Sequence, residues 1–163
     1  MFLRKIKLSQ LFSVVFLIFL LSGCNSNEKS VLKLMGESQT WNLTGYEVVI
    51  TPERFKAGNG ILNMRNANEY ITNSFHFETH AVINGEDLVV HAGSATGEGI
   101  DIAKKTTGAI EGGTYYNNGD PITLNEVSDI YMIIEWWDTG KSGSVKERID
   151  LYNKDSKELK NDR

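Results

Sequence analysis

The stretch "FHFETHAVINGEDLVVH" (residues 75–91) decides the fold, because its apolar and polar side chains alternate with a period of two. Such alternation places successive side chains on opposite faces of a β-strand. The residues that share the more apolar face are Phe75, Phe77, Thr79, Ala81 and Ile83. Asn84-Gly85 then forms the strongest short-range signal of a β-hairpin, and residues 88–91 return alongside. The stretch therefore predicts an antiparallel hairpin with one buried face.

Alternation of the same kind continues on either side of this hairpin. In residues 41–50, the positions of the apolar side chains in the alternation shift by one residue at Gly45. One extra residue at a glycine β-bulge would produce this shift. Residues 130–137 ("IYMIIEWW") are apolar on both faces apart from Glu135, which is typical of a central strand covered on each side. Residues 145–151 alternate as a final strand. Short strands separated by turn residues predict an all-β protein, an antiparallel sandwich or barrel.

The N-terminus has the pattern of a secretory signal peptide. The first seven residues include Arg4, Lys5 and Lys7 and no acid, and residues 11–21 are apolar apart from Ser13. This apolar run is shorter than the roughly 20 residues that a membrane-spanning helix needs. We therefore expect a signal-peptide helix that is removed from the mature protein.

The sequence "LSGC" (residues 21–24) resembles the lipobox of bacterial lipoproteins. The resemblance implies that Cys24 receives a diacylglyceryl group on its sulfur and that the signal is cleaved after Gly23. A free cysteine buried in the core is the alternative, but this single cysteine directly follows the apolar run. Two acyl chains hold a protein stably on a bilayer where one binds only marginally. We expect a protein anchored to the cell membrane, on its extracytoplasmic face.

The chain divides into a signal peptide (1–23), the lipidated cysteine with a flexible tether (24–35), a β-sandwich domain (36–152) and a charged tail (153–163). Loss of residues 1–23 removes three of the 17 Lys and Arg residues and none of the 21 Asp and Glu residues. The mature part then has 14 basic against 21 acidic residues, so its formal charge falls from −4 to −7. An acidic domain is a poor partner for nucleic acid, which binds basic patches.

Two segments resemble a family of small lipoproteins from Bacillus-type bacteria. These are "GESQTW" (residues 36–41) near the start and "IIEWW" (residues 133–137) followed by "KERIDLY" (residues 146–152) at the end. The family opens on a Gly-Glu-Ser…Trp segment and closes on an Ile-Glu-Trp hairpin. The resemblance implies one immunoglobulin-like β-sandwich on a lipid tether, without an assigned activity. This chain departs from the pattern by Trp137 and by a longer last turn.

The stretch "HFETH" (residues 76–80) contains the residue types that bind metal ions. His76, Glu78 and His80 share one face of a strand, but residues 76 and 80 lie about 13 Å apart along it. A site would need a further ligand, for which His91 on the neighbouring strand is the candidate. A solvated polar face explains the stretch more simply, so we expect no metal and no other cofactor.

Adjacent aromatic pairs give the one hint of a binding site. Tyr115 and Tyr116, like Trp136 and Trp137, point to opposite faces if they lie on strands. Trp137 and one of the tyrosines are candidates to stack together on a sugar ring, because exposed aromatic residues often mark recognition sites. The alternative is a central strand whose two faces are both buried.

No pattern for catalysis is present in the sequence. Ser94 lies near His91, but the glycines around it miss the G-x-S-x-G spacing. We expect a non-catalytic binding or interaction module of the cell envelope, with an envelope protein or a wall component as its partner. A lipoprotein that binds a wall sugar or a metal is the alternative, and an enzyme is the least favoured.

Overall fold

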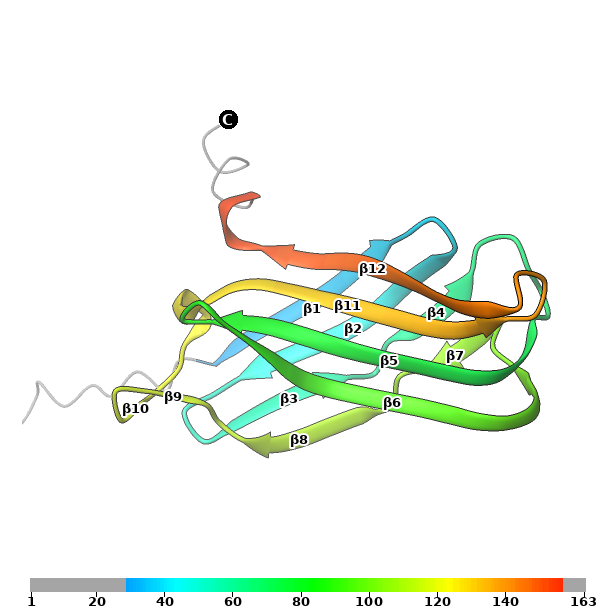
Figure 1. The fold of residues 1–163 in the computed structure, drawn as a ribbon. Helices are drawn as coiled ribbons and strands as arrows, with labels where there is room; N and C mark the ends of the chain where they lie inside the picture. Colours follow the sequence, from blue (N-terminus) through cyan, green and yellow to red (C-terminus); the bar gives the residue numbers. More distant parts are fainter. Residues whose placement is uncertain (1–28, 157–163) are drawn as a thin grey trace, which may run out of the picture.

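A computed structural model describes residues 29–156 and shows twelve β-strands and one short 3₁₀ turn in that range (Figure 1). The first six strands are β1 (Ser30–Glu37), β2 (Trp41–Ile50), β3 (Arg54–Gly58), β4 (Ile61–Met64), β5 (Ile71–Ile83) and β6 (Glu86–Asp101). The others are β7 (Lys104–Thr106), β8 (Ala109–Gly113), β9 (Tyr116–Asn117), β10 (Asp120–Pro121), β11 (Val127–Asp138) and β12 (Gly143–Asn153). The 3₁₀ turn η1 (Leu124–Glu126) precedes β11. The predicted all-β class is confirmed.

Two antiparallel sheets face each other as a sandwich (Figure 1). One sheet has the strand order β12-β11-β5-β6, and the other has the order β7-β4-β2-β3-β8, with β1 on the free side of β2. The strands β3 and β4 lie end to end, because they pair with opposite halves of β2. The immunoglobulin-like topology stays a prediction.

The core fills the space between the sheets. Its largest fully buried side chains include Trp41 and Tyr46 from β2 and Met132 and Ile134 from β11. Burial of such side chains contributes roughly 1.5–3 kcal/mol each to folding. The long β5 spans the full length of the sandwich and sets the distance between its two ends.

The predicted β5–β6 hairpin is confirmed. Ile83 pairs with Glu86, and both turn residues, Asn84 (φ 53°) and Gly85 (φ 81°), have the positive φ that a tight hairpin turn requires. The five residues predicted to share a face are all buried. The bulge at Gly45 is also confirmed, because Leu43 and Tyr46 are both buried and the β1–β2 register shifts beside them.

Strand β11 differs from its prediction, because another sheet covers only one of its faces. Met132, Ile134 and Trp136 point into the core. On the outer face Tyr131 is buried by its neighbours, with the His80 ring stacked 4.7 Å away and the Arg148 guanidinium 3.6 Å above its ring. Amphipathic side chains thus cover this face in place of a third layer.

The sandwich begins at Ser30, and not at residue 36 as predicted. Strand β1 pairs with β2 from Ser30 opposite Ile50 onward, and it buries Leu32 and Leu34. Residues 30–35 are therefore part of the domain and not of the predicted tether. The predicted signal peptide, Cys24 and most of the charged tail lie outside the described residues.

Candidate functional site

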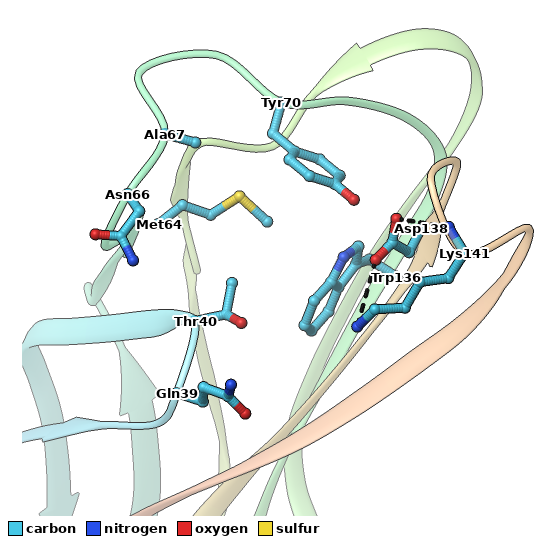
Figure 2. Close-up of a pocket in the computed structure, with 9 residues that line it drawn as sticks. All are labelled: Gln39, Thr40, Met64, Asn66, Ala67, Tyr70, Trp136, Asp138 and Lys141. Carbon is cyan, nitrogen blue, oxygen red and sulfur yellow. Dashed lines mark hydrogen bonds and ion pairs between the residues drawn. The ribbon is translucent and has the colours of Figure 1, made fainter.

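Three connections meet at one end of the sandwich, which we call the pocket end. They are residues 38–40 between β1 and β2, residues 65–70 between β4 and β5, and residues 139–142 between β11 and β12. They enclose a cavity of about 350 Å³ (Figure 2). The cavity is lined by Gln39, Thr40, Met64, Asn66, Ala67, Tyr70, Trp136, Asp138 and Lys141.

The first connection is held by Glu147, which reaches it from β12 in the opposite sheet. Its carboxylate accepts hydrogen bonds from the Ser38 hydroxyl (2.5 Å), the Thr40 amide (2.9 Å) and the Thr40 hydroxyl (2.6 Å). Burial by itself would raise the pKa of Glu147, but these hydrogen bonds outweigh it and lower the pKa. The carboxylate therefore fixes this turn against the other sheet.

The second connection is held by Asp101 at the end of β6. One carboxylate oxygen accepts hydrogen bonds from the backbone amides of Tyr70 and Ala103, each at 3.0 Å. These two bonds lower the pKa of Asp101. The Arg65 amide also donates to the Thr40 carbonyl at 2.8 Å, which joins the first and second connections.

The third connection is held by Asp138, the last residue of β11. Its Oδ1 accepts hydrogen bonds from the amides of Gly140 (2.9 Å) and Lys141 (3.2 Å), and its Oδ2 lies 3.6 Å from the Lys141 Nζ. The Tyr70 hydroxyl points toward the same carboxylate (Figure 2). Burial alone would raise the pKa of Asp138, but these donors lower it overall. Burial and the neighbouring Asp138 together raise the pKa of Tyr70.

Trp136 forms the inner boundary of the cavity. It is only 3% exposed and packs edge-on against Trp41, with 5.7 Å between the rings. Trp41 in turn contacts Phe75 on β5. Because these rings belong to the core, the aromatic surface of the pocket is fixed before any ligand arrives.

The structure does not bring the predicted aromatic residues together. Trp137 is 39% exposed and lies at the pocket end, where its carbonyl accepts a hydrogen bond from Thr72. Tyr115 and Tyr116 lie beside Ile83, at the other end of β5. The eleven residue steps from Thr72 to Ile83 correspond to about 36 Å of strand. The prediction that Trp137 and one of the tyrosines stack together on one sugar ring is therefore wrong.

The two tyrosines differ in their surroundings. Tyr115 packs edge-on against Phe55 at 5.2 Å, and burial raises the pKa of its hydroxyl. Tyr116 is 66% exposed in the β9–β10 hairpin. Only Tyr116 is therefore free to contact a partner through most of its ring.

His76, Glu78 and His80 share the outer face of β5, as predicted. The Nε2 of His76 lies 3.1 Å from one Glu78 oxygen, and the Nε2 of His80 lies 3.4 Å from the other. The hydrogen bond to His76 makes the largest contribution to lowering the pKa of Glu78. The strand spacing keeps the two imidazoles on opposite sides of the carboxylate, while Asp87 binds the second nitrogen of His80 at 3.0 Å.

His91, the candidate third ligand, lies on the opposite face. It is 3% exposed, and its Nδ1 lies 2.9 Å from the Tyr46 hydroxyl, which also donates to Thr79. The register of β5 and β6 shifts beside His91, so that Val90 and His91 are both buried. Burial lowers the pKa of His91. Within residues 29–156, no group of three or more His, Cys, Asp or Glu is arranged to hold a metal ion.

Sequence reasoning missed Tyr70, Asp138 and Lys141 as site residues. The turn after β11 was predicted, but nothing in the sequence indicates that Tyr70 faces it. The lipidation site, Cys24, lies outside the described residues. Among the helical residues that are described, no helix is long and apolar enough to cross a membrane.

Comparison of the chain with protein-family models, with curated proteins and with solved structures gives no match. The site must therefore be interpreted from its own geometry.

Proposed function

We propose that this protein is a lipid-anchored, extracytoplasmic binding module of the cell envelope, and that the pocket end is its binding surface. The observation that carries the proposal is the direction of β1. This strand starts at Ser30, paired with Ile50, and leads toward the turn at residues 38–40, which lines the pocket (Figure 1). The chain thus enters the sandwich at the end opposite the pocket.

Lipid on Cys24 would hold that opposite end near the bilayer, so we call it the anchor end. Six residue steps separate Cys24 from Ser30, a reach of at most about 20 Å when extended. The strands of the sandwich are longer than this tether, since the 13 residues of β5 extend about 43 Å. With the long axis upright, the pocket would face away from the membrane, toward wall or envelope partners.

The lining of the pocket supports binding more than catalysis. Asp138 is the only carboxylate among the described residues that line it. Hydrolysis of glycosides generally uses a pair of carboxyl groups, and nucleophilic catalysis needs a nucleophile beside a base. Asp138 instead accepts hydrogen bonds from backbone amides of its own loop and so stabilises the shape of that loop.

The proposal is tested by mass spectrometry of the protein isolated from membranes of the native host. We expect a mature chain that begins at Cys24 and has the mass of an added diacylglyceryl group. In the Cys24→Ser variant we expect the uncleaved precursor. A wild-type chain that keeps residues 1–23, or whose Cys24 has no lipid, would contradict the proposed anchoring.

A further inference from the structure

We infer that the pocket binds a neutral carbohydrate of one or two rings. The inference rests on the proposal that the pocket end is the binding surface, and it names the class of ligand. It depends on the charge balance, the polar groups and the shape of the cavity.

The charges of the lining favour a neutral ligand. Asp138 and Lys141 are the charged residues that line the cavity, and they lie 3.6 Å apart, so that their charges compensate. Both oxygens of Asp138 already have partners in its own loop. A cation would have to compete with these donors, and an anion that approached Lys141 would also approach Asp138.

The uncharged polar groups suit hydroxyl groups. The amides of Gln39 and Asn66 and the hydroxyls of Thr40 and Tyr70 line the same cavity (Figure 2). The Thr40 hydroxyl already donates to Glu147 and the Tyr70 hydroxyl is directed at Asp138, so these two are left to accept hydrogen bonds from a ligand. The Gln39 and Asn66 amides both donate and accept. A sugar hydroxyl has the same double capacity, so neighbouring hydroxyls on a ring can bond to several of these side chains.

The apolar part of the lining suits the C–H face of a sugar ring. Met64, Ala67 and the ring of Tyr70 lie across the cavity from Gln39 and Lys141, with Trp136 between them (Figure 2). The volume of about 350 Å³ is near the lower limit of small-molecule sites, which range from about 300 to 1,000 Å³. One or two rings would fit it, and a longer chain would extend into solvent.

The site is also ordered in advance. Glu147, Asp101 and Asp138 each fix one of the three connections through hydrogen bonds to its backbone. A ligand would therefore not need to order these loops, which lowers the entropic cost of binding.

The test is a titration of the full chain, purified in a detergent without a sugar headgroup and followed by tryptophan fluorescence and calorimetry. The neutral probes are glucose, N-acetylglucosamine, maltose and N,N′-diacetylchitobiose. The charged probes are cationic glucosamine, anionic glucuronic acid and the zwitterions glycine and D-alanine. We expect saturable binding of at least one neutral sugar, with weaker binding of every charged probe.

The variants locate the binding. Tyr70→Ala should weaken binding of the best neutral sugar by about tenfold or more, and Tyr70→Phe by less, because it keeps the ring. Trp137→Ala is the matched control, since Trp137 is an exposed aromatic residue at the same end that does not line the cavity. It should change the affinity by less than about twofold. Circular dichroism and thermal melting confirm that each variant is folded.

Lys141→Met tests the charge argument at a side chain that is 71% exposed, where folding is little affected. Without the ammonium group, the negative charge of Asp138 is no longer compensated and attracts the cationic glucosamine. The preference for N-acetylglucosamine over glucosamine should therefore decrease or reverse. An unchanged preference would contradict the charge argument and with it the proposal.

The proposal is overturned if no neutral sugar binds, if a charged probe binds more tightly, or if Trp137→Ala abolishes binding. Tight binding of an amino acid that depends on Tyr70 would overturn the carbohydrate class but leave a binding module. Failure of lipidation would appear in the mass of the chain and not in these titrations, so the two proposals fail separately.

Discussion

At the pocket end, a carboxylate of the opposite sheet holds the connection at residues 38–40, whereas at the anchor end the η1 turn is capped by its own residues. Glu147 bonds to residues more than a hundred positions away in the sequence. At the anchor end, Thr123 and Glu126 close η1 through a capping box between neighbours. The bonds of Glu147 make the shape of the pocket depend on both sheets. The side-chain cap of η1 is local, although Asn84 and Lys154 also donate to carbonyls of that turn.

This difference explains why a cavity with a fixed shape forms at one end. A loop held by its own residues can change its position as a unit, but a loop bonded to the opposite sheet moves only with that sheet. The exposed Tyr116 belongs to the locally closed end. We therefore expect substitutions at the two ends to differ in size and in their effect on binding.

The largest effect is expected for Glu147→Ala. It removes the acceptor of three hydrogen bonds and leaves the Thr40 amide without that partner, so the free energy of unfolding should fall by about 2 kcal/mol. Urea denaturation measures the change. Glu135→Ala is the matched control. Glu135 lies on β11, which pairs with the β12 strand of Glu147, and its substitution removes one exposed hydrogen bond from Ser144. Equal losses in the two variants would mean that Glu147 does not hold the turn.

The pH dependence of the free energy of unfolding should also depend on Glu147. Because the pKa of folded Glu147 is lowered, its contribution is present above its unfolded pKa of about 4.3 and is lost as the pH falls through the folded value. Urea denaturation between pH 3 and pH 7 should thus show stability falling below about pH 4 in the wild type. Glu147→Gln should have a flatter acid limb. An unchanged acid limb would assign the acid sensitivity to other carboxylates.

A smaller effect is expected for Glu126→Gln at the anchor end. The variant weakens hydrogen bonds from the Thr123 amide (2.8 Å) and hydroxyl (2.7 Å), but the helical turn is short and local. The free energy of unfolding should fall by about 0.5–1 kcal/mol, as for other helix caps. Sugar affinity, measured by calorimetry, should not change. A loss of affinity would show that the two ends are coupled.

The smallest effect is expected for Tyr116→Ser. The ring is mostly exposed, so its removal should change the free energy of unfolding by less than about 0.5 kcal/mol. Thermal melting provides the measurement. A clear destabilisation would mean that Tyr116 packs in the folded state more tightly than its exposure indicates.

Local patterns in the sequence predicted the hairpin over residues 75–91, but not the continuation of its strands to residues 71 and 101. Asn84-Gly85 fixed the turn, and the alternation of residues 75–83 fixed the buried face. His91 was misplaced because the extra residue beside it in β6 changes the alternation, and no glycine or proline marks that bulge. Periodicity predicts a face only as long as the register has no interruption.

The candidate site was not predictable in the same way. It depends on Glu147 and Asp101 reaching loops that are distant in the sequence, and on Tyr70 meeting Asp138. A single sequence contains no signal for such pairings. Of the three connections at the pocket end, the sequence predicted only the turn between residues 130–137 and 145–151. It placed the aromatic site on Trp137 and the tyrosines, because adjacent aromatic residues were its only visible hint.

We expect a ligand to bind at the pocket end, where Glu147, Asp101 and Asp138 hold the connections. The most direct measurement is chemical-shift mapping by NMR of the ¹⁵N-labelled chain, titrated with the neutral sugar that binds best. We expect shifts confined to the amides of residues 38–40, 64–70 and 136–141, with none at Tyr115 and Tyr116. Shifts centred on those tyrosines, or on His76 and its neighbours on the outer face of β5, would contradict it.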